Sequence, residues 1–298
     1  MNESSPTATP LEHDEEKVKE GVKERMRGSA AGERPWALVT GASAGIGLEF
    51  CRQLAARGYS LVLLARREER LREIAEELGE SHGADCRVIT ADLSDPAACE
   101  FIQQALDEAG ISVELLVNNA GYGVPGKLVD VPWETHQAFL QVMVTAVCEL
   151  TWRLMPGMIA RGRGHIINVA SVAGLSPSTA GHTLYGASKA FLIKFSEALA
   201  QEGAPHGVRV SALCPGFTYS EFHDVTGTRD RVSQLPGYLW LQADEVVADG
   251  LDAVLRDKPR VVTVPGGVYK LLVWISGAFP GLGRWLANRN AHKFRDAD

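Results

Sequence analysis

Short apolar runs alternate along the chain with longer segments in which apolar residues recur at helical spacing. The runs lie at 37–39, 61–65, 87–90, 115–119, 165–171, 208–215 and 260–266. Their nearly continuous apolar character is typical of strands that helices cover on both faces, whereas strict alternation marks a sheet with one face in water. We therefore predict a single α/β domain over residues 35–266, built on a doubly wound parallel sheet of about seven strands.

The two ends of the chain depart from this pattern. Residues 1–34 carry eight acidic and six basic residues and no aromatic residue, which predicts a disordered, charged tail. Residues 267–298 are predicted to be an amphipathic extension, in which glycines and a proline break the apolar stretch 268–287 into a hairpin too short to span a bilayer. Three interpretations of that stretch stay open: packing on the domain or across a dimer, a wall of the substrate pocket, and peripheral contact with a membrane.

Composition and charge narrow the class of partner. The 298 residues are 45% hydrophobic, and 30 Lys and Arg against 37 Asp and Glu give a net charge of -7. This favours a small-molecule partner over nucleic acid. Five cysteines without any CxxC pair argue against a disulfide framework or a metal site and favour a reducing, cytoplasmic location. Neither a signal peptide nor a run of about 20 uninterrupted apolar residues is expected from the pattern.

A glycine-rich turn follows the first apolar run and precedes a helical segment. Residues 40–47 read TGASAGIG. Such a turn lets backbone N–H groups and the helix N-terminus face a pyrophosphate, with Gly41 and Gly45 at the close approach and Gly47 where the helix packs on the sheet. The spacing is GxxxGxG, which differs from the GxGxxG of the commonest dinucleotide motif, and a tight turn without a ligand remains the alternative.

Two arginines follow the second run, where an NAD-binding site of the Rossmann type would carry an acid. Arg66 and Arg67 would attract the 2′-phosphate of NADP(H), and an acid would repel it. We therefore predict that NADP(H) is preferred over NAD(H), the alternative being that both residues only begin a charged helix. Asp92, after the third run, would accept from the adenine amino group or cap the next helix.

Three side chains form a candidate catalytic group. Tyr185 and Lys189 are four residues apart on a predicted helix, so they share one face. Ser171 ends a strand at the sheet edge where open α/β folds bind ligands. A tyrosine titrates near pH 10, so exchanging a proton at neutral pH requires its pKa to fall by about 3 units. The neighbouring ammonium is expected to supply part of that fall.

Taken together, these motifs resemble the short-chain dehydrogenase/reductase (SDR) family, of the classical type. TGASAGIG resembles its cofactor motif, the NNAG of residues 118–121 its central-strand motif, the three side chains above its Ser-Tyr-Lys group, and Pro215-Gly216 its nicotinamide-side turn. The resemblance implies that Tyr185 is the general acid/base, that Lys189 binds the nicotinamide ribose and lowers the tyrosine pKa, that Ser171 polarises a carbonyl, and that Asn118 helps hold the cofactor strand. It also implies a dimer.

The candidate cofactor site combines the glycine-rich turn, the two arginines, Asp92, the NNAG loop, the catalytic pair and the segment after the sixth run. Its members are Gly41, Ser43, Ala44, Gly45, Ile46, Gly47, Arg66, Arg67, Asp92, Asn119, Ala120, Gly121, Tyr185, Lys189, Pro215, Gly216 and Thr218. No metal ligand is predicted. The expected activity is the NADP(H)-dependent interconversion of a carbonyl and an alcohol.

One position departs from the resemblance. Met143 stands where the family usually carries an asparagine that holds a water in the proton relay. A thioether is at best a weak acceptor and cannot donate. The relay must then run through water, Thr145 or another group. The alternative is a catalytically weak protein that binds a dinucleotide or a partner.

Residues 218–241 lie where the family places its substrate lid. Phe222, Tyr238, Leu239 and Trp240 in this segment indicate an apolar pocket and therefore a hydrophobic substrate. Three further side chains are candidates for contact with that substrate, with a bystander role as the alternative: His182, Tyr122 and Tyr219.

Overall fold

The computed structural model describes residues 34–178, 180–181, 183–219, 236–279 and 281. The predicted charged tail, apart from its last residue, lies outside the described residues, as do His182, Phe222 and most of the predicted substrate lid.

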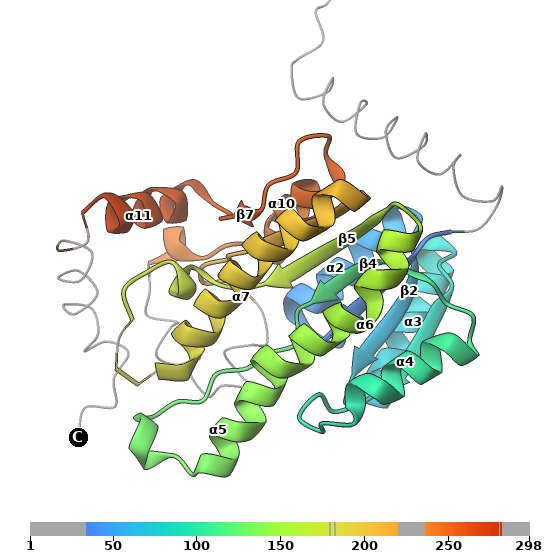
Figure 1. The fold of residues 1–298 in the computed structure, drawn as a ribbon, viewed down its shortest axis with the longest axis horizontal. Coiled ribbons are helices and arrows are strands. Elements are labelled where there is room, and N and C mark those ends of the chain that lie inside the picture. The colour runs from blue at the N-terminus through green and yellow to red at the C-terminus, as the bar shows by residue number, and fades with distance from the viewer. Residues whose placement is uncertain (1–33, 179, 182, 220–235, 280, 282–298) are drawn as a thin grey trace, which may run out of the picture.

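Seven parallel strands form one sheet in the order β3-β2-β1-β4-β5-β6-β7 (Figure 1). Their bounds are β1 Trp36–Thr40, β2 Ser60–Ala65, β3 Cys86–Thr90, β4 Val113–Asn118, β5 Gly164–Val169, β6 Val208–Leu213 and β7 Val262–Thr263. The four strands at the centre of the sheet are almost wholly buried, which is why their sequences read as continuous apolar runs. The predicted doubly wound, Rossmann-type sheet is confirmed.

Helices cover both faces of the sheet. The helices are α2 Gly45–Ala56, α3 Glu68–His82, α4 Ala98–Glu108, α5 Trp133–Leu140, α6 Ala146–Ala160, α7 Thr183–Gly203, α10 Ala243–Leu255 and α11 Gly267–Ala278, and a π-helical turn, Gln141–Thr145, joins α5 to α6. One apolar core lies between the sheet and α2, α3 and α10, and a second lies between the sheet and α4, α6 and α7. The sheet therefore holds its loops rigidly at its carboxyl edge.

The C-terminal part differs from the prediction in the length of its last strand. The predicted seventh strand over 260–266 is only two residues long, because Pro265 has no N–H to donate and Gly266, with a φ of 77°, turns the chain into α11. The first arm of the predicted hairpin is the helix α11, which ends at Ala278, one residue after Gly277, and most of the second arm lies outside the described residues. In Figure 1, α11 stands away from the body of the sheet.

One helical run, Trp133–Ala160, is long and apolar enough to cross a membrane by length and composition. Half of the most apolar stretch of this run is buried within the fold, and most of the buried apolar residues of the run belong to the second core. A core helix of a globular domain has the same character, so the run does not by itself indicate a membrane span.

Candidate functional site

The site lies where the loops after β1 and β4 leave neighbouring strands. Thr40, the last residue of β1, joins the two loops: its Oγ1 accepts from the backbone N–H groups of Asn119 and Ala120, both at 2.9 Å. The amide Nδ2 of Asn119 donates back to the carbonyl of Thr40 at 2.9 Å. Strand order changes direction between β1 and β4, which is the crevice where open α/β sheets bind ligands.

The glycine-rich turn adopts a backbone that only glycine takes readily. Gly41 and Gly45 have φ angles of 67° and 53°. A Cβ on Gly47 would lie 2.2 Å from the carbonyl oxygen of Gly41, so this glycine sets how closely α2 approaches the turn. Gly41 has a role beyond the predicted close approach to a ligand. A Cβ there would meet Asn119 Nδ2 at 2.9 Å, so Gly41 is also needed for packing on the neighbouring loop.

The N-terminus of α2 is open to an anion. Its N-cap, Ala44, has no side-chain hydrogen bond, and the first turn holds no acidic residue. The first N–H groups of a helix lack intrahelical partners and carry the positive end of the helix dipole. Residues 43–46 therefore form the kind of cradle that binds a phosphate.

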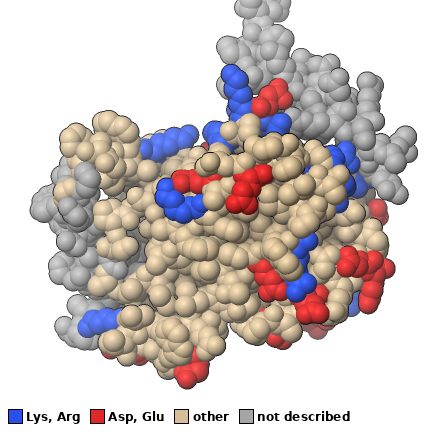
Figure 2. All heavy atoms as spheres, viewed as in Figure 1, with Lys and Arg blue, Asp and Glu red and all other residues tan. Residues whose placement is uncertain are grey.

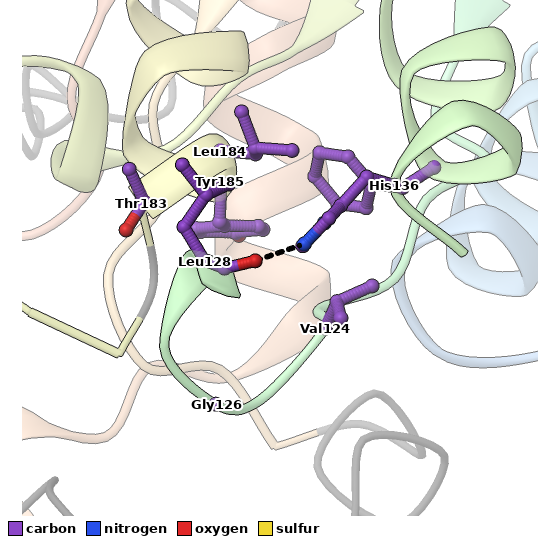
Figure 3. Close-up of a pocket in the computed structure, with 8 residues that line it drawn as sticks. Val124, Gly126, Leu128, His136, Thr183, Leu184 and Tyr185 are labelled. Atoms are coloured by element: carbon purple, nitrogen blue, oxygen red, sulfur yellow. Dashed lines mark hydrogen bonds between the residues drawn. The ribbon is translucent and has the colours of Figure 1, made fainter. Parts of the chain in front are cut away.

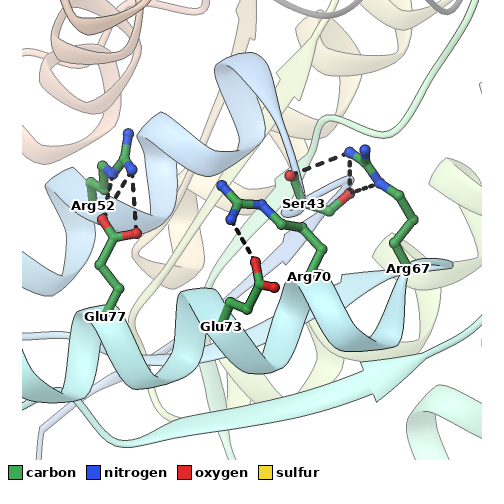
Figure 4. Close-up of polar contacts among 6 residues, drawn as sticks. All are labelled: Ser43, Arg52, Arg67, Arg70, Glu73 and Glu77. Atoms are coloured by element: carbon green, nitrogen blue, oxygen red, sulfur yellow. Dashed lines mark hydrogen bonds and ion pairs between the residues drawn. The ribbon is translucent and has the colours of Figure 1, made fainter.

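Arg67 lies against this cradle. Its Nη2 donates to the hydroxyl of Ser43 at 3.1 Å and to the Ser43 carbonyl at 3.3 Å (Figure 4). The other arginine of the pair, Arg66, approaches Asp92, with Nη1 3.7 Å from Oδ2, and is largely exposed. Four predicted cofactor residues from the loops after β1, β2 and β3 thus meet at the same end of the sheet.

Asp92 does not cap the next helix. Its Oδ1 accepts from the backbone N–H and hydroxyl of Ser94, at 2.9 and 2.8 Å, whereas α4 begins only at Ala98. Burial raises the pKa of Asp92, but the hydrogen bonds from Ser94 and the charge of Arg66 outweigh it and hold the pKa below its usual range. The carboxylate is therefore an ionised acceptor beside Arg66.

The candidate catalytic side chains meet between the end of β5 and the start of α7. Lys189 Nζ donates to the carbonyl of Val169 at 2.7 Å and lies 5.7 Å from the centre of the Tyr185 ring. Ser171, two residues after β5, accepts from the N–H of Ala173 at 3.1 Å. Ser171 also hydrogen-bonds Tyr185. Residues from two elements, 14 positions apart, therefore form one group as the spacing predicted.

The pKa of Tyr185 differs from the expected one. Burial raises the pKa of Tyr185 to about 12, which the hydrogen bond from Ser171 offsets only in part. Burial lowers the pKa of Lys189 to about 8. The expected lowering of the tyrosine pKa is absent here because desolvation outweighs every other effect on the phenol. At neutral pH Tyr185 is a protonated donor and Lys189 is mostly an ammonium.

Asn118, the last residue of β4, is buried in a chain of hydrogen bonds. Its Nδ2 donates to Asn168 Oδ1 at 2.9 Å and to Thr151 Oγ1 at 3.3 Å, and Asn168 Nδ2 donates in turn to Ser196 Oγ at 2.9 Å. This buried chain ties β4 to β5 and to the helices α6 and α7. Asn118 acts on the site through the strand that carries Asn119 and the rest of the NNAG loop.

Tyr269 of α11 packs on the turn after β6. A Cβ on Gly216 would lie 2.0 Å from its ring, so only glycine allows this contact. The phenol accepts from the N–H of Phe217 at 3.0 Å and donates to the carbonyl of Leu239 at 2.6 Å. The Thr218 hydroxyl donates to the carbonyl of Gly216 at 3.1 Å. The extension therefore begins as part of the wall behind Pro215 and Gly216.

Met143 sits in the π-helical turn and is buried. A Cβ on Gly121 would come within 2.8 Å of its sulfur, so the thioether fills the space beside the NNAG loop. π-Turns recur at functional sites in helices. Thr145, named above as a substitute for the relay, is exposed, so its hydroxyl faces away from this packing.

A small pocket beside Tyr185 contains residues that the sequence pattern did not single out. Its lining is Val124, Gly126, Leu128, His136, Phe139, Thr183, Leu184 and Tyr185 (Figure 3). His136 Nε2 lies 2.9 Å from the carbonyl oxygen of Leu128, which can only accept, so Nε2 carries the proton. The other nitrogen, Nδ1, is then an acceptor, and it is buried without a hydrogen-bond partner among the described residues. A lone helical histidine gives no signal in a single sequence.

Aromatic residues of the predicted lid region form a stack. The rings of Tyr219 and Trp240 stack at 4.7 Å, and Phe217 lies 5.9 Å from Trp240. Tyr122, the other tyrosine of interest, packs edge-on against Phe139 at 5.6 Å. These contacts supply the apolar surroundings that the lid sequence indicates.

Comparison with known proteins identifies relatives. The family model described as short chain dehydrogenase matches residues 35–230. A 7beta-hydroxysteroid dehydrogenase of Collinsella aerofaciens is 36% identical over 202 residues, covering 68% of this chain and 73% of its own length. A very-long-chain 3-oxoacyl-CoA reductase of Anas platyrhynchos is 35% identical over 196 residues, which cover 64% of this chain and 62% of the reductase, less than two thirds of it.

Solved structures agree in fold. A short-chain dehydrogenase from Sphingobium yanoikuyae in complex with NADPH superposes with a TM-score of 0.73 at 32% identity, covering 89% of this chain and 97% of that one. A 7beta-hydroxysteroid dehydrogenase structure gives a TM-score of 0.72 at 33% identity, with 82% and 92% covered.

Proposed function

Because the chain belongs to the short-chain dehydrogenase/reductase family, and is a dehydrogenase or reductase by that membership, we propose that it uses NADP(H) to interconvert a carbonyl and an alcohol on a hydrophobic substrate. The observation that carries this proposal is the group in which Ser171 hydrogen-bonds Tyr185 and Lys189 Nζ lies 5.7 Å from the centre of the Tyr185 ring. The NADPH-bound relative supports the choice of cofactor.

The residues at the cradle fit a dinucleotide. Gly41 and Gly45 take left-handed backbone conformations, and the uncapped start of α2 offers N–H groups to a pyrophosphate. Arg67 beside Ser43, with Arg66 next to it in the chain, offers guanidinium donors for a 2′-phosphate. Asp92 would receive the adenine, and Pro215 and Gly216 would flank the nicotinamide.

Bound NADPH supplies the hydride for the reduction. The chain supplies the proton: Tyr185, protonated at neutral pH, donates its phenolic hydrogen to the carbonyl oxygen as that oxygen gains charge. The Ser171 hydroxyl donates a second hydrogen bond to the same oxygen. Lys189, held by the Val169 carbonyl, positions the ribose and favours the phenolate that Tyr185 becomes.

We propose a substrate of the steroid or long-chain acyl type. Two relatives are named for a hydroxysteroid and for a very-long-chain 3-oxoacyl-CoA. In this chain the aromatic stack of Tyr219 and Trp240 would contact such a carbon skeleton. The acceptor Nδ1 of His136 would receive a hydrogen bond from a hydroxyl group elsewhere on the molecule or from a water.

We also propose a cytoplasmic homodimer. The support is the composition, the five cysteines, none of which forms a disulfide, and exposed apolar side chains such as Trp152 on α6 and Phe191 on α7. Light scattering of the purified chain would test the dimer.

The experiment is NADPH oxidation followed by absorbance across a panel of hydrophobic ketones, with Tyr185→Phe as the matched variant. The variant loses only the phenolic hydroxyl, so turnover should fall by about 10² to 10⁴ while NADPH affinity changes little. Equal turnover in both proteins would remove Tyr185 from the proposal.

A catalytically weak protein is the second candidate, and Met143 is the observation that favours it. Met143→Asn in the same assay separates the two. Turnover by the native chain excludes the catalytically weak protein. Tight NADPH binding without turnover in both the native chain and Met143→Asn supports it.

A further inference from the structure

Helix α11 is an apolar helix with little of the molecule around it. Tyr269 is its only buried residue. Large apolar side chains project from it into solvent, with exposed fractions of 56% for Leu271, 41% for Leu272 and 63% for Trp274. Val268 at 39% and Phe279 at 56% extend the same surface. We call these five residues the α11 apolar surface.

The helix is nevertheless fixed to the domain. Tyr269 packs on Gly216 and bonds the chain at Phe217 and Leu239, so the first turn of α11 cannot swing freely. The apolar surface is therefore a rigid feature beside the loop that follows β6. An exposed apolar patch of this kind is uncommon on a monomer and marks an interaction site.

The charge of the sequence segment that contains α11 indicates the occupant. Of the 30 Lys and Arg of the chain, seven lie in residues 258–295, and none of the 37 Asp and Glu do. Three of the seven, Lys258, Arg260 and Lys270, belong to the part that the structure describes. The rest of the chain is correspondingly acidic. Lys270 is the one charged residue of α11 itself, and in Figure 2 no acidic side chain is visible on the corner that α11 forms.

We propose that the α11 apolar surface inserts into the interface of an anionic membrane. A basic segment that carries aliphatic and aromatic side chains is the chemistry of an interfacial helix, since its apolar residues enter the acyl boundary and its cations contact lipid headgroups. With 12 residues at 1.5 Å each, α11 is about 18 Å long and too short to span a hydrocarbon core of about 30 Å. It therefore lies in the plane of the interface.

Two other occupants fit less well. A second copy of the chain would bring another basic, acid-free segment against this one in a symmetric contact, which like charges disfavour. Nucleic acid would use the basic residues but would leave Leu271, Leu272 and Phe279 without an apolar partner.

The experiment is co-sedimentation of the full chain with vesicles of phosphatidylcholine, alone and mixed with phosphatidylglycerol. Native protein should bind the mixed vesicles, and binding should weaken as salt is added. The double variant Leu271→Gln, Trp274→Gln should bind at least about tenfold more weakly. Lys270→Glu should weaken binding to the mixed vesicles several-fold.

The matched control is Phe101→Gln, a residue that is 52% exposed on α4, and Figure 1 shows α4 at the other end of the molecule from α11. It should bind vesicles as the native chain does, and unfolding midpoints should show that every variant is folded. Undiminished binding by the double variant overturns the proposal. A native chain that binds neither type of vesicle also overturns it. In that case, binding to single-stranded DNA would identify nucleic acid as the occupant, and an oligomer that the double variant loses would identify a second copy of the chain.

Discussion

At the scale of single residues, the site depends on a few polar contacts that tie neighbouring loops together. Thr40 Oγ1 joins the loops after β1 and β4, and Arg67 joins the loop after β2 to Ser43. Each contact is worth about 1 kcal/mol or a little more. Their value lies in holding backbone N–H groups and guanidinium groups at fixed positions for a ligand.

Arg67 tests the cofactor preference. Arg67→Ala removes a guanidinium that would bond the 2′-phosphate, so NADPH affinity should fall by about 10- to 100-fold while NADH affinity changes much less. Isothermal titration of each cofactor measures both values.

The matched control for that variant is Arg70→Ala. Arg70 lies in the first turn of α3, just after Arg67, but pairs with Glu73 at 2.8 Å (Figure 4). It should bind both cofactors as the native chain does. Parallel losses for NADPH and NADH in Arg67→Ala would remove the argument for NADP(H).

Lys189 tests the electrostatics through stability. Its pKa falls from 10.5 to about 8 on folding because the ammonium is buried. Between these values the unfolded chain holds a proton that the folded chain lacks, so stability rises with pH. From pH 8 to 10.5 the unfolding free energy of the native chain should therefore rise by up to about 3 kcal/mol relative to that of Lys189→Met. Urea titrations without cofactor measure it.

Other groups titrate in the same range, so the difference between proteins is the quantity that matters. Burial raises the pKa of Cys86 to about 11 and of Tyr185 to about 12, and both lower stability as pH rises. Lys194→Met is the control, since Lys194 is exposed and pairs with Glu197. A flat difference for Lys189→Met would mean that the ammonium is not destabilised by burial.

Single residues also show how far sequence alone reaches. Ser171, Tyr185 and Lys189 could be predicted because their spacing places them on one strand end and one helix face. His136 could not, since what matters is a bond to Leu128 and a buried nitrogen beside Tyr185, and both depend on tertiary packing. The raised pKa of Tyr185 was also beyond reach, because it depends on burial.

At the scale of elements, the glycine-rich turn shows local sequence and tertiary contact acting together. The turn needs glycine at 41 and 45 for its φ angles, but at 47 for the close contact between α2 and the turn. Apolar runs and turn residues predict such elements well. The π-turn at 141–145 has no comparable local signal.

Two glycine substitutions separate these causes. Gly47→Ala places a methyl group 2.2 Å from the Gly41 oxygen, so the free energy of unfolding should fall by about 2 to 3 kcal/mol. Gly79→Ala in α3 meets its nearest atom at 3.8 Å and should raise that free energy by about 0.5 to 1 kcal/mol. Urea unfolding of both variants measures the changes. Similar changes in both variants would show that helix propensity, and not the contact, decides.

At the scale of the whole molecule, the parts that could be predicted are those fixed by repetition along the chain. Continuous apolar strands and amphipathic helices determine two cores on either side of one sheet. The apolar pattern of 268–287 suits packing on the domain, a pocket wall and membrane contact equally well, so it could not decide among them. The environment of α11 depends on a tertiary contact, the packing of its Tyr269 on Gly216.

The edges of the sheet have a consequence for behaviour at high concentration. An edge strand offers unpaired backbone groups to other chains and so invites aggregation. The edge strands here are β7 and β3. β7 has only two residues and lies close to Pro265, and the five-residue β3 carries an exposed Arg87. A short strand next to a proline and a strand with a protruding cation are both poor templates for intermolecular sheets. The sheet is thereby protected against growing into fibrils, a protection that is independent of the site and its chemistry.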